Sequence, residues 1–214
     1  SRGSRVSVIV LTNGDKWHKS PLFHGTKKSL ARLREKESLS ALRLLGVQNI
    51  YHLRFEDGKL SENDYFDPLI RVLRNIRADI ILTHSGQEKH HDHLQTYATV
   101  FRLCSYHGEP MPLNNPFWFA NNVSGHTPHC LFFHTTLCEL EGKDVVFVRL
   151  TKTLVEKKIA AILSHKSQIV DFKRTAERIW ITARFIGQLA GCQFAEALQH
   201  SRTARPQAVS WLHD

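Results

Sequence analysis

The sequence contains little cysteine, a single methionine and no long apolar run. Four of its 214 residues are cysteine, and no two of them have the C-x-x-C spacing of a zinc knuckle or a redox motif. A secreted disulfide scaffold would be shorter and richer in cysteine, so we expect reduced thiols in a cytoplasmic protein. A transmembrane helix needs about 20 consecutive apolar residues, and no run approaches that length. The first residues, from Ser1, also lack the apolar region of a signal peptide.

Acidic side chains are scarce relative to basic ones. The chain has 20 Asp and Glu against 29 Lys and Arg, a formal net charge of +9, which suggests an acidic partner such as a phosphate, a nucleic acid or an anionic membrane surface. The basic residues are scattered without interleaved aromatics, so no nucleic-acid interface is expected. Apolar residues make up 42% and charged residues 23%, an ordinary globular balance. We therefore predict one domain over residues 1–214.

The first half of the chain alternates apolar runs with amphipathic segments. Strands are expected at Val6–Leu11, Asn49–Leu53 and Asp79–Thr83. The first and third of these segments, VSVIVL and DIILT, are mostly apolar and rich in β-branched residues, which is typical of parallel strands buried on both faces. Helices are expected at Ser29–Leu45, at Asp67–Ile76 and from Leu94 onward. This alternation predicts βαβ units and a doubly wound, mostly parallel α/β sheet with helices on both faces.

The second half follows a different pattern. Strands of a small mixed or antiparallel extension are expected at Phe117–Ala120, Leu131–Leu137 and Val145–Leu150. Two helices, Leu154–His165 and Phe172–Ala190, are expected to close the chain. The second of these has one continuous apolar stripe, formed by Ala176, Ile179, Trp180, Ala183, Ile186 and Ala190.

The densest group of chemically active side chains is the segment EKHHDH, residues 88–93. It follows the third expected strand, and ligands of open α/β sheets bind outside the carboxyl ends of strands. We expect Asp92 to be the N-cap of the next helix and to orient His90. His93 would lie in the first helical turn, facing the same cavity as His90. These residues indicate a metal or acid/base site, and the alternative interpretation is a solvated polar loop. A metallo-β-lactamase-type H-x-H-x-D-H motif is disfavoured, because Glu88 stands where its first histidine should be.

Three further groups are candidates on weaker grounds. Arg34 and Glu37 form a charged pair beside the apolar stripe of the first helix, either as a structural ion pair or as an arginine that grips a ligand. Asp57 follows the second strand in a turn. Lys158 and His165 lie two turns apart on a late helix, where basic residues near a helix C-terminus are the simpler interpretation.

These segments together resemble the LmbE-like, or PIG-L, family of zinc-dependent N-acetylglucosamine deacetylases. The resemblance covers nearly the whole chain in order, through VSVIVLTNGD, REKESLSALRLLGV, LRFEDGKL, ADIILTHSGQEKHHDHLQT, KIAAILSHKSQ and GCQFAEAL. The fourth segment resembles the family's H-P-D-H motif, with His91 in place of proline. The order and spacing of the six segments carry the assignment.

The resemblance implies a Rossmann-like fold and a zinc-dependent hydrolysis of an N-acetyl group. It makes His93 a zinc ligand and His90 the acid and oxyanion stabiliser, with Asp92 as its orienting partner. It makes Arg34 and Asp57 substrate-binding residues. The implied partner is an N-acetylated amino sugar; whether it is linked to a phosphate or a lipid, and whether the protein forms a homo-oligomer or associates with a membrane surface, stays open.

One family motif has no counterpart here. A-H-P-D-D-E, which supplies two zinc ligands and the general base of the family, does not occur, and the first strand and helix of the family fold are expected to be missing with it. A lone His93 should hold zinc poorly, since catalytic zinc takes three protein ligands. We therefore expect the chain to be a fragment of an active deacetylase or to have a misassigned start, with a non-catalytic binding or partner protein as the alternative. A third hypothesis is a basic anion- or nucleic-acid-binding domain without metal.

Overall fold

The structure, a computed structural model, describes residues 4–16, 23–105, 129–133 and 145–200. The strand expected at Phe117–Ala120 lies outside the described residues, as does the end of the one expected at Leu131–Leu137. The chain forms two compact units, each built from separate segments. Unit 1 contains Ser1–Lys59 and Arg149–Glu196, and unit 2 contains Leu60–Val148 and Ala197–Asp214.

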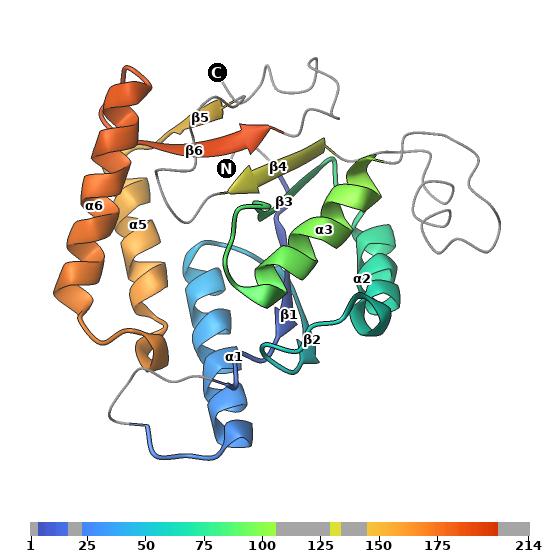
Figure 1. The fold of residues 1–214 in the computed structure, drawn as a ribbon. Helices are drawn as coiled ribbons and strands as arrows, with labels where there is room; N and C mark the ends of the chain where they lie inside the picture. The colour runs from blue at the N-terminus through green and yellow to red at the C-terminus, as the bar shows by residue number, and fades with distance from the viewer. Residues whose placement is uncertain (1–3, 17–22, 106–128, 134–144, 201–214) are drawn as a thin grey trace. The chain divides into compact units, whose positions relative to one another are not determined.

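Strands and helices alternate from residue 7 to residue 105, as the sequence predicts for the first half of the chain (Figure 1). The strands are β1 (Ser7–Thr12), β2 (Asn49–Phe55), β3 (Ile80–His84), β4 (His129–Phe133), β5 (Val145–Arg149) and β6 (Ala195–His200). The helices are α1 (Lys27–Leu44), α2 (Glu62–Ile76), α3 (His91–Ser105), α5 (Lys152–Leu163), the short 3-10 helix η2 (Lys166–Gln168) and α6 (Phe172–Leu189). The predicted α/β class is confirmed.

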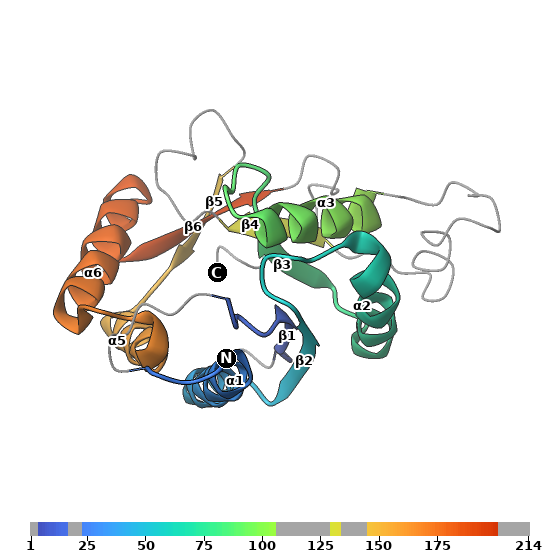
Figure 2. The same ribbon diagram turned by 60° about the horizontal axis from the view of Figure 1, so that its bottom comes forward.

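Unit 1 combines a two-stranded sheet with the helices α1, α5 and α6. Strands β1 and β2 pair in parallel (Figure 2), in register from Ser7 opposite Asn49 to Val10 opposite His52. Every residue of β1 is half-buried, so this strand is not buried on both faces as its apolar run predicts. Among the described residues this sheet has only two strands, β1 and β2, so β1 lies at a sheet edge and stays partly exposed.

The core of unit 1 lies mainly between α5 and α6. Its buried members are Val155, Ile159, Ile179, Ala183 and Phe194. Helix α5 also packs against α1. The apolar stripe predicted on the last helix is the one that faces this core, with Ala176 and Trp180 packed beside its buried residues. Burial of that stripe is what holds α6 in place.

Unit 2 contains a mixed sheet with the strand order β3-β4-β6-β5. Strand β3 is parallel to β4, and β4 is antiparallel to β6, which confirms the mixed extension of the sheet. Helix α3 packs against β3 and β4, and α2 packs against α3. The core between them contains Leu60, Tyr65, Phe66, Leu69, Ile70 and Val100. Leu82 is 57% exposed, so β3 is not buried on both faces either.

Several element boundaries differ from the predicted ones. Helix α2 begins at Glu62, before the predicted start at Asp67, and contains Pro68. Helix α5 ends at Leu163, so His165 lies beyond it, at the N-cap of η2. Strand β6 was not predicted, because AEAL is a helix-favouring sequence and pairing with β4 overrides that preference. No helix within the described ranges is both long and apolar enough to cross a membrane.

Candidate metal and catalytic site

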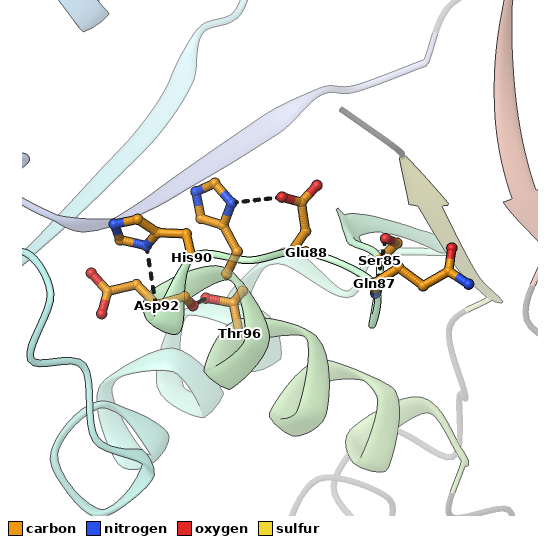
Figure 3. Close-up of polar contacts among 7 residues, drawn as sticks. Ser85, Gln87, Glu88, His90, Asp92 and Thr96 are labelled. Carbon is orange, nitrogen blue, oxygen red and sulfur yellow. Dashed lines mark hydrogen bonds and ion pairs between the residues drawn. The ribbon is translucent and has the colours of Figure 1, made fainter. Parts of the chain in front are cut away.

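The candidate site of unit 2 lies where β3 ends and α3 begins. We call its residues the β3–α3 cluster: His84, Glu88, His90, Asp92 and His93. His84 is the last residue of β3, and α3 starts at His91. Glu88 and His90 lie on the connecting loop, close to the start of α3, where Asp92 lies (Figure 3). The predicted position after a strand's carboxyl end is therefore confirmed for this loop.

Two imidazoles and one carboxylate meet in this cluster. Potential ligand atoms of His84, Glu88 and His93 all lie within 4.8 Å of one another. His93 Nδ1 is 3.3 Å from Glu88 Oε2, and the Glu88 side chain is only 6% exposed against 36% for His93. The rings of His84 and His93 are stacked, with centroids 3.9 Å apart and planes inclined by 6°. Imidazole nitrogen and carboxylate oxygen are donor types that zinc accepts.

His84 has the strongest electrostatic perturbation of the cluster. Burial lowers the pKa of His84 to about 4, with the nearby imidazoles of His93 and His90 acting in the same direction and Glu88 opposing them. His84 is therefore neutral at physiological pH. Neutral imidazole is the form that coordinates metal ions.

His90 is exposed and held by the backbone of α3. Its Nδ1 accepts a hydrogen bond of 3.3 Å from the Asp92 N–H, so the neutral ring carries its proton on Nε2. The His90 ring is also inclined by 41° to that of His93, with centroids 4.8 Å apart. An exposed ring with a protonated Nε2 can donate to a substrate. His90 and Asp92 also have potential ligand atoms within 4.8 Å of each other.

Asp92 has a different local role from the N-cap role predicted for it, and His91 shares that role. Helix α3 begins at His91, with the Leu94 N–H bonded to the His90 carbonyl, so the N-cap position falls on His90 and not on Asp92. The buried Asp92 carboxylate instead accepts from the Leu60 N–H at 3.1 Å, and His91 Nε2 lies 3.1 Å from the Leu60 carbonyl. The two residues thus fix the start of α3 to the chain at Leu60.

Unit 1 contains the two proposed substrate-binding residues, Arg34 and Asp57. Arg34 donates to the Gly14 carbonyl. Asp57 accepts from the Lys16 N–H at 3.4 Å, and its own N–H donates to Asp15 at 3.2 Å. Gly14 has a φ of +61°, and a side chain there would lie 3.1 Å from the Arg34 guanidinium, so glycine is required for this approach.

Burial lowers the pKa of Arg34, while the carboxylates of Asp57, Glu37 and Asp15 oppose the shift. Three carboxylates thus surround the half-buried guanidinium. Glu37 accepts from the Ser167 N–H at 2.7 Å and from the Ser167 hydroxyl at 2.6 Å, and both residues are buried. This favours the structural interpretation for Glu37. Lys158 forms an ion pair with Glu196, so it too has a structural partner.

Sequence reasoning singled out His90, Asp92 and His93 but gave no role to His84 or Glu88. The signal was the spacing H-x-x-x-E-x-x-x-x-H, which begins at the end of a strand. The predicted strand Asp79–Thr83 stops one residue short of His84, and Glu88 stands only as a mismatch to the metallo-β-lactamase-type motif. The loop between β3 and α3 brings His84 and Glu88 close to His93.

The fold and the cluster define an α/β protein with a histidine- and carboxylate-rich site after a parallel strand. Residues 1–104 match the family model described as PIG-L: GlcNAc-PI de-N-acetylase. The chain is also 25% identical over 173 residues to the uncharacterized deacetylase YaiS of Escherichia coli, covering 78% of this chain and 77% of that protein. The chain is therefore similar to the PIG-L/LmbE-like deacetylases over residues 1–104, slightly under half of its length.

Solved structures share the fold at lower identity. The N,N'-diacetylchitobiose deacetylase of Pyrococcus horikoshii has a TM-score of 0.74 at 22% identity, covering 97% of this chain and 78% of that one. GalB, the 4-carboxy-2-hydroxymuconate hydratase of Pseudomonas putida, has a TM-score of 0.71 at 19% identity, covering 97% and 89%. Proteins described as a deacetylase and as a hydratase share this fold, so the reaction must be argued from the site.

Proposed function

We propose that this protein hydrolyses the N-acetyl group of an N-acetylglucosaminyl-type substrate, releasing acetate and leaving a free amine. The observation that carries the proposal is the β3–α3 cluster, which lies inside the part of the chain that matches the deacetylase family. Relatives named as deacetylases, including one for diacetylchitobiose, support the choice of an acetylated amino sugar. We also propose a cytoplasmic location, where Cys192 would stay a free thiol.

The residues present fit a zinc ion. His93 offers an imidazole nitrogen at the start of α3, with a second imidazole and a carboxylate within 4.8 Å, and catalytic zinc sites use such nitrogen and oxygen donors. Zinc would supply Lewis-acid chemistry at an acyl carbonyl. His93 is the proposed zinc ligand in this function.

His90 is the proposed proton donor. Its Nδ1 accepts from the Asp92 N–H, which leaves the Nε2 proton directed away from the helix backbone. That proton can stabilise the developing oxyanion and then pass to the departing amine nitrogen, since amide cleavage requires protonation of nitrogen. Asp92 positions His90 through this backbone contact, and its buried carboxylate fixes Asp92 itself.

Arg34 and Asp57 are the proposed substrate-binding residues. Arg34 carries a fixed charge among three carboxylates, and Asp57 is half-buried with its backbone and carboxylate both hydrogen-bonded. Such held polar groups are suited to recognising sugar hydroxyls. A phosphate-linked sugar would be favoured further by the net charge of +9.

The test is acetate release by the zinc-loaded full chain from N,N'-diacetylchitobiose and from an N-acetylglucosaminyl phospholipid. Release of one acetate per new amine is expected from at least one of them. His90→Ala should lower kcat by about 10²- to 10⁴-fold, the range of general acid–base catalysis. His93→Ala should lower both zinc content and activity. The exposed His24 in unit 1 gives the matched control, because His24→Ala should leave both unchanged.

The remaining outcomes decide against the proposal. Sugar binding without acetate release would indicate the non-catalytic binding protein. Binding of simple polyanions that weakens steeply with salt, with no bound metal, would indicate the basic anion-binding domain.

A further inference from the structure

The solvent side of helix α6 carries a row of exposed arginine and apolar side chains. Its members follow one another at spacings of four, three, four and four residues, which places them along one side of a helix. We call them the outer row of α6: Arg174, Arg178, Ile181, Phe185 and Leu189. All five are exposed, and the three apolar ones are 67%, 47% and 58% exposed in chain order. We propose that the outer row binds a membrane surface that contains anionic lipids.

The outer row lies opposite the stripe that packs α6 into unit 1. The buried residues Ile179 and Ala183 join the core with α5, which lies beside α6 (Figure 1). Ile181 is two residues from each of them, so at 3.6 residues per turn it points to the far side of the helix. Helix α6 is thus apolar on two sides, and the described residues cover one of them. An exposed apolar patch with a polar rim is typical of a binding surface for a protein or a membrane.

The charges of α6 complement an anionic surface. Glu177 is the one acidic residue within the helix, which exposes four cations: Lys173, Arg174, Arg178 and Arg184. Within the described ranges, none of these four side chains forms an ion pair with a carboxylate. An arginine pairs with phosphate through two parallel N–H groups, and its apolar stem can lie along lipid chains. The helix can therefore contact lipid phosphates and acyl chains at the same time.

A second copy of this chain fits the outer row less well. A symmetric interface brings the same patch of two chains together, so the charges of two outer rows would add, with no carboxylate in either row to offset them. A stable protein interface also needs about 20–30 residues from each partner, whereas the outer row provides a single ridge along one helix. A bilayer requires no matching shape. It requires apolar side chains beside basic ones, as on helices that lie in a membrane interface.

The inference goes beyond the proposed function, because it assigns a surface of unit 1 and no step of the reaction. It agrees with the proposed cytoplasmic location, since the cytoplasmic leaflet of a membrane carries anionic lipids. Vesicle binding is measured without a substrate, so the two proposals can fail separately. Acetate release without vesicle binding would contradict this inference alone, and vesicle binding without acetate release would contradict the proposed function alone.

The experiment is co-sedimentation of the full chain with vesicles of phosphatidylcholine and phosphatidylserine in equal parts, with pure phosphatidylcholine vesicles in parallel. The unchanged chain should bind the mixed vesicles and leave the neutral ones. Ile181→Gln and Phe185→Gln should each weaken binding at least about fivefold, because each removes apolar area from the lipid contact. Leu44→Gln is the matched control, because Leu44 lies on α1 and is 47% exposed, like Phe185. It should bind like the unchanged chain. Far-UV circular dichroism shows that each variant folds.

Removal of positive charge tests the polar half of the contact. Arg174→Gln combined with Arg178→Gln should weaken binding about 25-fold, since each basic residue near an anionic leaflet contributes about fivefold. Arg32→Gln combined with Lys36→Gln removes the same charge from exposed positions of α1. This control pair should weaken binding less than about threefold, because salt screens charges that do not touch the membrane.

Three results would overturn the inference. Equal losses in the two pairs of charge variants, with Phe185→Gln unchanged, would show that the net charge of the chain holds it to the vesicles. Binding of poly-L-glutamate that Phe185→Gln weakens as much as vesicle binding would assign the outer row to an acidic protein. A dimer in sedimentation velocity that Phe185→Gln dissociates, without vesicle binding by the unchanged chain, would make the outer row a surface between two copies.

Discussion

Glu37 is a buried carboxylate that joins α1 to η2 within unit 1. Both of its oxygens accept hydrogen bonds from Ser167, at 2.7 and 2.6 Å. Hydrogen bonds to a charged group contribute about 1.5–3 kcal/mol each, and a buried donor left unpaired adds a desolvation penalty. Glu37→Gln keeps the size of the side chain but loses its charge.

We therefore expect Glu37→Gln to lower the free energy of unfolding by about 2 kcal/mol in urea titrations. The exposed Glu177 on α6 provides the control, since Glu177→Gln should change the free energy by less than about 0.5 kcal/mol. Equal effects of the two substitutions would contradict a structural role for Glu37.

His165 is a half-buried histidine that should make unit 1 sensitive to acid. Burial lowers the pKa of His165; Arg34 acts in the same direction and Glu37 in the opposite one. Gln168 Nε2 lies 3.5 Å from its Nδ1. The unfolded chain titrates near the ordinary histidine pKa of about 6.5 and so binds more protons than the folded chain just below that pH.

The free energy of unfolding should accordingly fall as the pH drops from about 7 through 6.5 toward 5. His165→Gln should fall less steeply over the same range, in urea titrations at a series of pH values. His84 and His52 also have lowered pKa values, but they remain in both proteins, so the comparison isolates His165. An unchanged slope in His165→Gln would show that the folded protein does not exclude the proton from this ring.

Helix α6 shows on one element how far a sequence pattern reaches. Ile179 is 9% exposed in the core of unit 1, whereas Ile181, two residues later, is 67% exposed. Ile179→Ala should lower the free energy of unfolding by about 2–4 kcal/mol, because it removes buried methyl groups and leaves a cavity. Ile181→Ala should have almost no effect. Paired urea titrations of the two variants measure the contrast, and similar losses would place α6 in a different rotation.

The elements with a clear apolar period were predictable, and those that depend on distant partners were not. The α6 stripe and the parallel pairing of β1 with β2 follow from local sequence. Strand β6 forms by pairing with β4. No feature of the residues of β6 themselves predicts that pairing. The burial of β1 and β3 was overestimated, because an apolar run does not reveal how many layers cover a strand.

The same division applies to the candidate site. The segment from Glu88 to His93 was found because its histidines are adjacent in sequence. His84 could not be predicted as a member of the cluster, because its position beside His93 depends on the path of the loop between β3 and α3. The stacking of its ring on that of His93 is visible in the structure alone. The Leu60 contacts of His91 and Asp92 span about 30 residues, so no spacing within the motif predicts them.

At the scale of the whole molecule, zinc should stabilise the folded chain if the site within unit 2 forms. A ligand that binds only the folded state adds about 2.7 kcal/mol at a concentration one hundred times its Kd. The chain has 14 histidines and four cysteines, so zinc also binds the unfolded chain and reduces this gain. Thermal unfolding with and without zinc should show a higher midpoint for the unchanged protein and a smaller rise for His93→Ala, which lacks the proposed zinc ligand. A rise of equal size in both would mean that the stabilising zinc is bound elsewhere.

The contacts of Asp92 and His91 with the backbone of Leu60 should affect digestion by proteases. Lys59 has a side chain that is 65% exposed, and trypsin would be expected to cut after it. The next residue is Leu60, which is 2% exposed, with its N–H held by Asp92 and its carbonyl beside His91. A protease must draw the scissile peptide into its own cleft, which requires breaking these contacts first. Peptide mapping after brief trypsin treatment should find the Lys59–Leu60 bond cut slowly in the unchanged chain and faster in Asp92→Ala. The folded backbone thus protects a peptide bond although the lysine side chain before it is exposed.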